Sequence, residues 1–176
     1  MKATRIVVLP VMFLSLLVMG GCATSTVSAF QKISPSENNK VAVSSLAITE
    51  KNMETRKIPD ATEKAVADAI LTSLKGNLNK KGLLTDKASA SLYIDIQMYY
   101  RFHDFVEWLS AGEPAKVLIV QAILKDKNGS IVVQINSKDG TGALSDYRNI
   151  TTSVAEELAN QIEKILKEGV SVGKSP

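Results

Sequence analysis

The sequence predicts an α+β domain, a two-layer sandwich in which two helices cover one face of a four-stranded, mainly antiparallel sheet. Three observations carry this prediction. Two segments place apolar residues at helical spacing, around positions 60–82 and 153–169. Residues 92–103 alternate strictly between apolar and other side chains, as a half-buried strand does. Two further β-rich runs flank an Asn-Gly pair. The order strand, helix, three strands, helix packs most economically as two layers.

Composition and charge limit the function classes. The 176 residues are 45% hydrophobic, 22% charged and 5% aromatic, which excludes a largely disordered or fibrous protein. One Cys and one His exclude a zinc cluster and an internal disulfide framework, so we expect no metal and no cofactor. Removal of Lys2 and Arg5 with a leader lowers the formal charge from +3 to +1, so no basic excess favours nucleic acid as a partner.

The first 21 residues have the layout of a signal peptide. Lys2 and Arg5 precede an apolar run from Ile6 to Met19 that contains Pro10 and Ser15. A transmembrane helix needs about 20 apolar residues, so this run is too short to span a bilayer. We therefore expect the segment to be removed after export.

The single cysteine directly follows this run. The residues Met19, Gly20, Gly21 and Cys22 resemble the lipobox of bacterial lipoproteins, which usually has Leu where this chain has Met19. In that family a diacylglyceryl group is attached to the Cys thiol and a peptidase cleaves just before it. The resemblance assigns lipidation to Cys22 and peptidase recognition to the three residues before it. The open alternative is a free thiol beside an ordinary cleavage site.

Acyl chains on Cys22 would fix the protein to a membrane surface. Each buried methylene contributes about 0.8 kcal/mol, and two or three chains anchor firmly. Ala23 follows the cysteine, in place of the Asp that commonly retains lipoproteins on the inner membrane. The resemblance therefore implies the bacterial outer membrane, with the domain facing the periplasm.

The mature chain is expected to have three parts. Residues 22–40 are rich in Ser, Thr and Asn and predict a lipidated flexible tether. A single domain is expected over 41–169, followed by a polar tail at 170–176. The Val- and Ile-rich segment Val41–Thr49 predicts the first strand.

The first helix is predicted to begin at Asp60, as N-cap with Glu63 three residues later, and to end at Gly82. The second is predicted to begin at a capping box of Ser153 and Glu156, after a loop over 140–149. Gly169 ends it. The apolar stripes of the two helices are Val66, Ile70, Leu74 and Leu78, and Val154, Leu158, Ile162 and Ile165.

The strands between the helices are predicted to form an antiparallel meander. Residues 92–103 form the long first strand, and runs at 116–126 and 130–140 form the next two. Asn128 and Gly129 between them predict a type I′ turn, because both residue types tolerate positive φ.

Glycine motifs in the chain do not predict a nucleotide site. Residues 169–175 have three residues between their glycines where a phosphate-binding loop has four, and no helix follows. Gly140-Thr141-Gly142 lacks the third glycine of a dinucleotide site. A cluster of His103, Asp104 and Glu107 has residue types used in acid/base catalysis, but a solvated strand end is the preferred interpretation.

Two surfaces are candidates for binding a partner. The outward side of the long strand carries Tyr93, Tyr99 and Arg101. The connector that follows is apolar and aromatic at Phe105, Trp108 and Leu109. Buried aromatic anchors dominate many interfaces, although a lid or an extended hairpin would explain the connector equally well.

The whole chain resembles the small bacterial lipoproteins catalogued as domain of unknown function 4410. The resemblance covers roughly residues 41–168 and rests on the turn Asp126–Gly129 and on the closing helix SVAEELANQIEKIL. It implies an envelope location and a compact α/β domain, with no catalytic residues to assign. The order of elements is also similar to lipoproteins that activate wall synthases or assist envelope transport machines.

These observations predict a non-enzymatic binding or accessory module, held at the membrane by lipid on Cys22, whose partner is an envelope protein or a glycan. Two alternatives stay open. The first is an envelope hydrolase that uses His103 with Asp104 or Glu107. The second is a carrier of a small ligand or lipid, with a cavity between sheet and helices.

Overall fold

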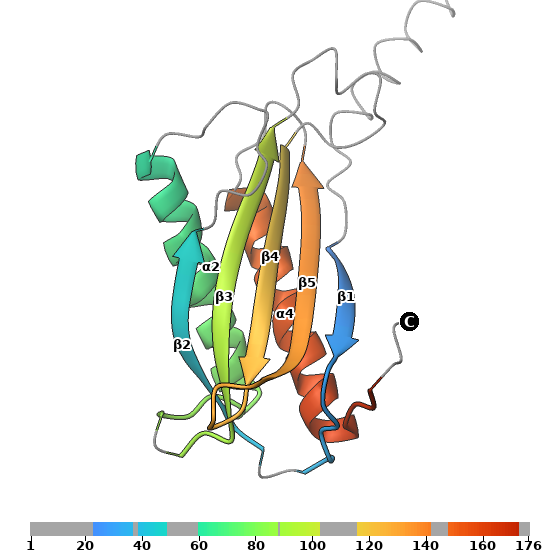
Figure 1. Ribbon diagram of the computed structural model, residues 1–176. Coiled ribbons are helices and arrows are strands. Elements are labelled where there is room, and N and C mark those ends of the chain that lie inside the picture. The colour runs from blue at the N-terminus through green and yellow to red at the C-terminus, as the bar shows by residue number, and fades with distance from the viewer. Residues whose placement is uncertain are drawn as a thin grey trace, which may run out of the picture.

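The computed structural model describes residues 23–36, 39–48, 60–87, 89–102, 116–141 and 148–172. Within these ranges the chain forms five strands and two helices (Figure 1). Their bounds, in chain order, are β1 (Thr24–Ala29), β2 (Val41–Ile48), α2 (Asp60–Lys80), β3 (Leu92–Phe102), β4 (Lys116–Lys125), β5 (Ile131–Thr141) and α4 (Arg148–Glu168).

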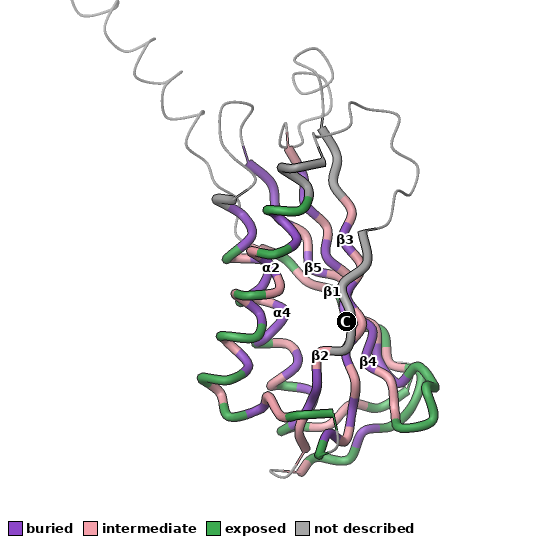
Figure 2. The backbone as a smooth tube through the Cα atoms, turned by 90° about the vertical axis from the view of Figure 1, so that its left-hand side faces the viewer, coloured by how far each residue is buried: buried purple, intermediate pink, exposed green. Residues whose placement is uncertain are grey.

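The strands form one mixed sheet in the order β1-β5-β4-β3-β2. The pairs β1/β5, β5/β4 and β4/β3 are antiparallel, while β2 and β3 are parallel and are connected through α2. Both helices lie on the same side of the sheet (Figure 2). The α+β class, the helix-covered sheet and its mainly antiparallel pairing are therefore confirmed, whereas the predicted four strands are corrected to five in the described part of the chain.

The fifth strand is β1, which lies inside the segment predicted to be a flexible tether. That prediction is wrong for Thr24–Ala29, which pairs in register with β5 from Thr24↔Lys138 to Ala29↔Val133. Burial alternates along β1, with Ser25, Val27 and Ala29 on the helix side and Thr24, Thr26 and Ser28 exposed. The helix side holds small residues, so the segment looks like a polar linker although its alternation is that of a strand.

The chain after β1 is also attached to the domain. Ile33 is 8% exposed and exchanges two backbone hydrogen bonds with Val170, of 3.0 and 3.1 Å. The predicted polar tail at 170–176 therefore begins with a residue that is paired with the N-terminal segment. The last residues of that tail lie outside the described residues.

The second helix begins earlier than predicted. Strand β5 extends to Thr141 and α4 starts at Arg148, so Ser153 lies inside the helix and does not cap it. The Ser153 hydroxyl donates to the Ile150 carbonyl, 3.0 Å away, and to the buried Asp139 carboxylate. The predicted stop is confirmed, because α4 ends at Glu168 and Gly169 has φ of 79°.

The turn between β4 and β5 is a hairpin, as predicted, but with a three-residue loop. The Gly129 N–H donates to the Asp126 carbonyl at 3.0 Å, and the Asp126 N–H donates to the Ser130 carbonyl at 3.0 Å. The loop Lys127–Gly129 thus has positive φ at Gly129, 82°, where a three-residue hairpin requires it. The Asp126 carboxylate accepts from the N–H groups of Asn128 and Ser130, both at 2.9 Å, and this favours the longer loop.

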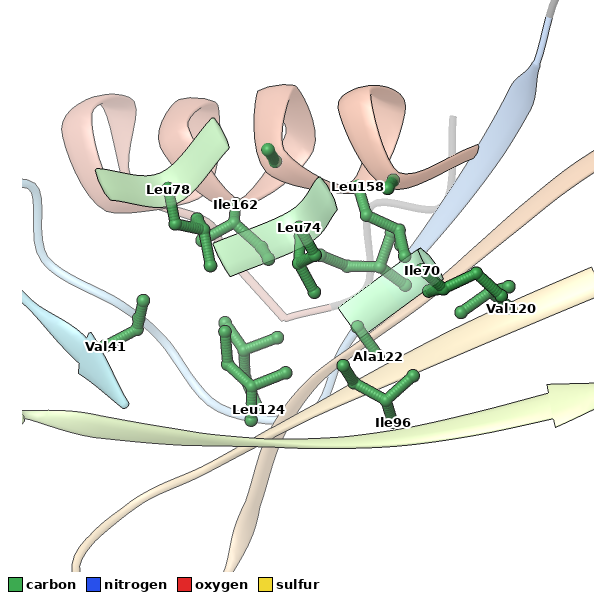
Figure 3. Close-up of a cluster of buried hydrophobic side chains, with 14 of the residues drawn as sticks. Val41, Ile70, Leu74, Leu78, Ile96, Val120, Ala122, Leu124, Leu158 and Ile162 are labelled. Atoms are coloured by element: carbon green, nitrogen blue, oxygen red, sulfur yellow. The ribbon is translucent and has the colours of Figure 1, made fainter. Parts of the chain in front are cut away.

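The core lies between the two helices and the sheet. Every apolar residue predicted on the two helical stripes is at most 4% exposed. From the sheet, alternate residues of β3 and β4 point into the same layer, among them Ile96, Ala122 and Leu124 (Figure 3). Every second residue of β3 from Leu92 to Met98 is buried against the helices, and the residues between them are half-buried. This confirms the predicted half-buried strand.

Candidate functional site

The candidate site is the outer face of the sheet, which we define as the side turned away from the helices. Cross-strand register places residues from four strands on it. Its described members include Tyr93, Asp95, Gln97 and Tyr99 from β3, Val117, Ile119, Gln121, Ile123 and Lys125 from β4, Gln134, Asn136 and Lys138 from β5, and Thr24, Thr26 and Ser28 from β1.

A row of amide side chains crosses the middle of this face. Gln97, Gln121, Asn136 and Thr26 are successive cross-strand partners on β3, β4, β5 and β1. The Gln121 Nε2 donates to Asn136 Oδ1 at 2.7 Å, and the Tyr99 hydroxyl donates to Gln97 Oε1 at 2.6 Å. We call these residues with Tyr99 the amide row. Their hydrogen bonds orient the side chains, so that the remaining donors and acceptors are held in a fixed array.

An ion pair lies beside the amide row, on the side nearer the β4–β5 turn. The Lys125 Nζ is 2.6 Å from Asp95 Oδ2, and the two side chains are 33% and 26% exposed. The Tyr93 hydroxyl donates to the Lys87 carbonyl at 3.0 Å, which ties its ring to the preceding loop. Both contacts limit the freedom of side chains that would otherwise move freely in solvent.

The outer face is not uniformly polar. Ile123 is 9% exposed and Val117 is fully buried, although both lie outside the core cluster on the helix side. Half-buried Ile119 lies between the amide row and Val117 along β4. The face thus offers hydrogen-bonding groups next to apolar side chains, a combination found in surfaces that bind proteins or sugars.

The structure places part of the predicted site on this face. Tyr93 and Tyr99 are half-buried members of the outer face. The backbone of Arg101 pairs with that of Val117 on β4. The connector residues Phe105, Trp108 and Leu109 lie outside the described residues. So do the lipobox residues Met19–Cys22 and the candidate catalytic cluster His103, Asp104 and Glu107.

The sequence prediction missed the amide row. Its signal was present as a glutamine or asparagine at the outward position of each meander strand, in Gln97, Gln121 and Asn136. Only the register shows that these residues are neighbours, because they are 15 or more positions apart in the chain.

A second surface feature is a groove of about 650 Å³ at the C-terminal end of α4. We call it the edge groove. Its apolar lining includes Val27 on β1, Ile33, Ile165 and Val170, and its charged lining residues are Lys32, Lys164 and Glu168. A volume of this order accommodates several side chains or one small ligand.

The described ranges contain no cluster of metal ligands and no helix that could span a membrane. No group of three His, Cys, Asp or Glu side chains there is placed to hold a metal ion. Neither α2 nor α4 carries a stretch apolar enough to cross a bilayer.

Comparison with known proteins shows likeness only to solved structures. No protein-family model and no curated sequence matches the chain. A PelC dodecamer from Paraburkholderia phytofirmans is 17% identical, with a TM-score of 0.48, over 77% of this chain and 94% of that one. A putative neuraminyllactose-binding hemagglutinin homolog from Helicobacter pylori is 16% identical, with a TM-score of 0.46, over 76% and 85%.

A PDZ domain protein from Parabacteroides distasonis is 13% identical, with a TM-score of 0.45, over 95% of this chain and 41% of that one. All three likenesses are too distant to carry a function to this chain.

Proposed function

We propose that this protein is a non-enzymatic binding or accessory module of the bacterial envelope, held on the periplasmic side of the outer membrane by acyl chains on Cys22. The observation that carries the proposal is the placement of the chain's one cysteine after Gly20 and Gly21, at the end of an apolar leader. That leader is too short to remain as a membrane span, so acyl chains are the attachment that this position favours.

Only a short stretch of chain would connect the lipid on Cys22 to strand β1. Strand β1 begins at Thr24, two residues after Cys22, and an extended chain spans at most about 3.6 Å per residue. The end of the sheet that contains Thr24 and its partner Lys138 would therefore lie close to the lipid surface. The β4–β5 turn, at the other end of the sheet in Figure 1, would point away from the membrane.

The outer face would supply the binding surface. An anchor confines the domain to a thin layer and so raises its effective concentration near a membrane-bound partner. The amide row, Lys125 and Asp95 offer donors and acceptors beside half-buried Ile119. A polar partner, either an envelope protein or a glycan, fits this surface.

The anchor is tested by cell fractionation of Cys22→Ala. We expect this variant to fold but to leave the membrane pellet after a high-salt wash, because the acyl chains have no attachment site. The matched control is Met19→Leu, which restores the usual lipobox residue and should stay in the pellet. Retention in the washed pellet of a Cys22→Ala chain from which the leader has been removed would contradict the proposal.

The binding face is tested by photocrosslinking in living cells. A photoreactive residue in place of Gln121, in the amide row, should give a reproducible adduct with an envelope component. The same residue in place of Lys75, which is exposed on α2, serves as the control. Adducts that form equally at both positions, or at neither, would count against the outer face.

A further inference from the structure

The free edge of β1 presents a row of backbone groups. The Phe30 N–H donates to the Val132 carbonyl at 2.9 Å, which extends the β1/β5 register by one pair. In an antiparallel pair, alternate residues direct both backbone groups to the neighbouring strand. The even-numbered residues of β1 therefore bond to β5, while Ser25, Val27 and Ala29 direct their N–H and C=O groups to the open edge.

Within the part of the chain that the structure describes, strand β1 lacks three of the features that normally protect an edge. Thr24–Ala29 contains no proline, no charged residue and no register shift. Natural sheets usually block their edges by one of these means, because a bare edge accepts another strand. The opposite edge strand, β2, has a register shift between Val43 and Ser45.

The edge groove lies beside this free edge. Val27 contributes its side chain to the groove from the helix side of β1, and Ile165 of α4 faces it. Lys32 and Lys164 are exposed at the groove, and no ion pair joins either ammonium group to a described residue. A strand added next to β1 would direct every second side chain into this groove, where the two lysines outnumber the one acidic lining residue, Glu168.

We propose that the β1 edge and the edge groove together bind an extended acidic peptide segment of a partner protein as a sixth strand. Main-chain hydrogen bonds to Ser25, Val27 and Ala29 hold the segment, as in other cases of strand addition. Its apolar side chains enter the groove, and its Asp or Glu side chains pair with Lys32 and Lys164.

A second copy of the chain fits this edge less well. Two β1 strands related by a twofold axis run antiparallel, so the two Thr24 ends lie at opposite ends of the pair. Six residues of strand span about 20 Å, so a sheet that stands upright on the membrane with one anchor inserted holds the other anchor away from the lipid. This step rests on the proposed anchor, whereas peptide binding does not.

The test uses the full lipoprotein, purified in detergent, and a displayed library of random decapeptides. We expect the selected peptides to carry Asp or Glu together with Val, Ile or Thr at every second position, because only that face of an added strand enters the groove that holds Lys32 and Lys164. Their affinities are then measured by fluorescence polarisation against variants of the edge and of the groove. Sedimentation in the same detergent reports self-association.

Two variants should weaken binding of the selected peptides. Ala29→Pro removes an outward N–H without removing a bond to β5, and the double substitution Lys32→Glu with Lys164→Glu reverses both exposed charges. We expect a loss of about fivefold to tenfold for the charge reversal, as for solvent-exposed charge pairs. Lys75→Glu, on exposed α2, is the matched control and should leave affinity unchanged.

Three results would overturn this proposal. They are a selection without acidic enrichment, selected peptides that bind both variants as tightly as the wild type, and a self-association that Ala29→Pro abolishes. None of these results bears on Cys22, so failure here is distinguishable from failure of the membrane anchor.

Discussion

Gly169 occupies a position that no other residue fits without strain. Its φ is 79°, and a Cβ atom there would lie 2.7 Å from the Ile33 carbonyl oxygen and 2.9 Å from Pro35 Cδ. The glycine lets the end of α4 approach the segment that follows β1. This close approach places Val170 opposite Ile33, where the two backbones pair.

We expect Gly169→Ala to lower the free energy of unfolding by about 2 kcal/mol, because positive φ costs about 1–2 kcal/mol for a residue with a Cβ and the contact adds to it. Gly76→Ala is the control. Gly76 lies within α2, and a Cβ atom added there would meet nothing within 4 Å, so alanine should raise the free energy by about 0.5–1 kcal/mol. Urea unfolding measures both, and equal effects would contradict this account.

Glu163 connects the two helices through charge. Its Oε2 is 2.5 Å from Lys81 Nζ, just after α2, and its Oε1 is 2.7 Å from Lys167 Nζ on α4. The hydrogen bonds from Lys167 and Lys81 hold the pKa of the Glu163 carboxyl below its usual range. The ionised Glu163 carboxylate is therefore more stable in the folded protein than in the unfolded chain.

The stabilisation from Glu163 is present above the unfolded pKa of about 4.3 and is lost as the pH falls through the lower folded value. We expect Glu163→Gln to lower the free energy of unfolding by less than about 1 kcal/mol at pH 7, because the pair is only partly buried. The difference from wild type should close at acidic pH. Exposed Glu156 supplies the control, Glu156→Gln, and a pH-independent difference for Glu163→Gln would contradict the assignment.

Residue burial was largely predictable from periodicity alone. The helical stripes and the inward residues of β3 are buried as expected, because amphipathic spacing decides which side chains meet the core. The contacts of polar residues were not predictable. Ser153 and Glu156 match a capping box, but tertiary contact with Asp139 uses the Ser153 hydroxyl inside the helix.

At the scale of elements, strand β1 occupies a segment that would be a flexible tether if the domain began at Val41. A tether would tolerate proline at any position, whereas a paired strand would not. Thr26 lies opposite Asn136 and directs its N–H to β5 by the alternation of the pair.

We expect Thr26→Pro to lower the free energy of unfolding by about 1–3 kcal/mol, because a β5 carbonyl loses its donor. Ala29→Pro keeps the bonds to β5 and should cost less. Hydrogen exchange of the β1 and β5 amides reports the same difference locally. If Thr26→Pro had the free energy of unfolding of the wild type, and if the β1 amides exchanged as fast as those of an unfolded chain, the segment would be a tether after all.

At the scale of the whole molecule, the topology was predictable only in part. Local signals gave the helices, the meander and the order of those elements. The pairing of β1 with β5 joins residues more than 100 positions apart, and β1 carries few of the apolar side chains that mark a strand. Register between distant strands, and hence the amide row, depends on contacts that no local pattern encodes.

At the same scale, lipid on Cys22 would fix the whole protein to a membrane surface. Mass spectrometry of the protein purified from its own host tests this attachment most directly. Spectra of the intact mature chain and of its N-terminal peptide should show a chain that begins at Cys22 with a diacylglyceryl group on the sulfur. An unmodified Cys22 thiol, or a mature chain that begins at another residue, would contradict lipid anchoring.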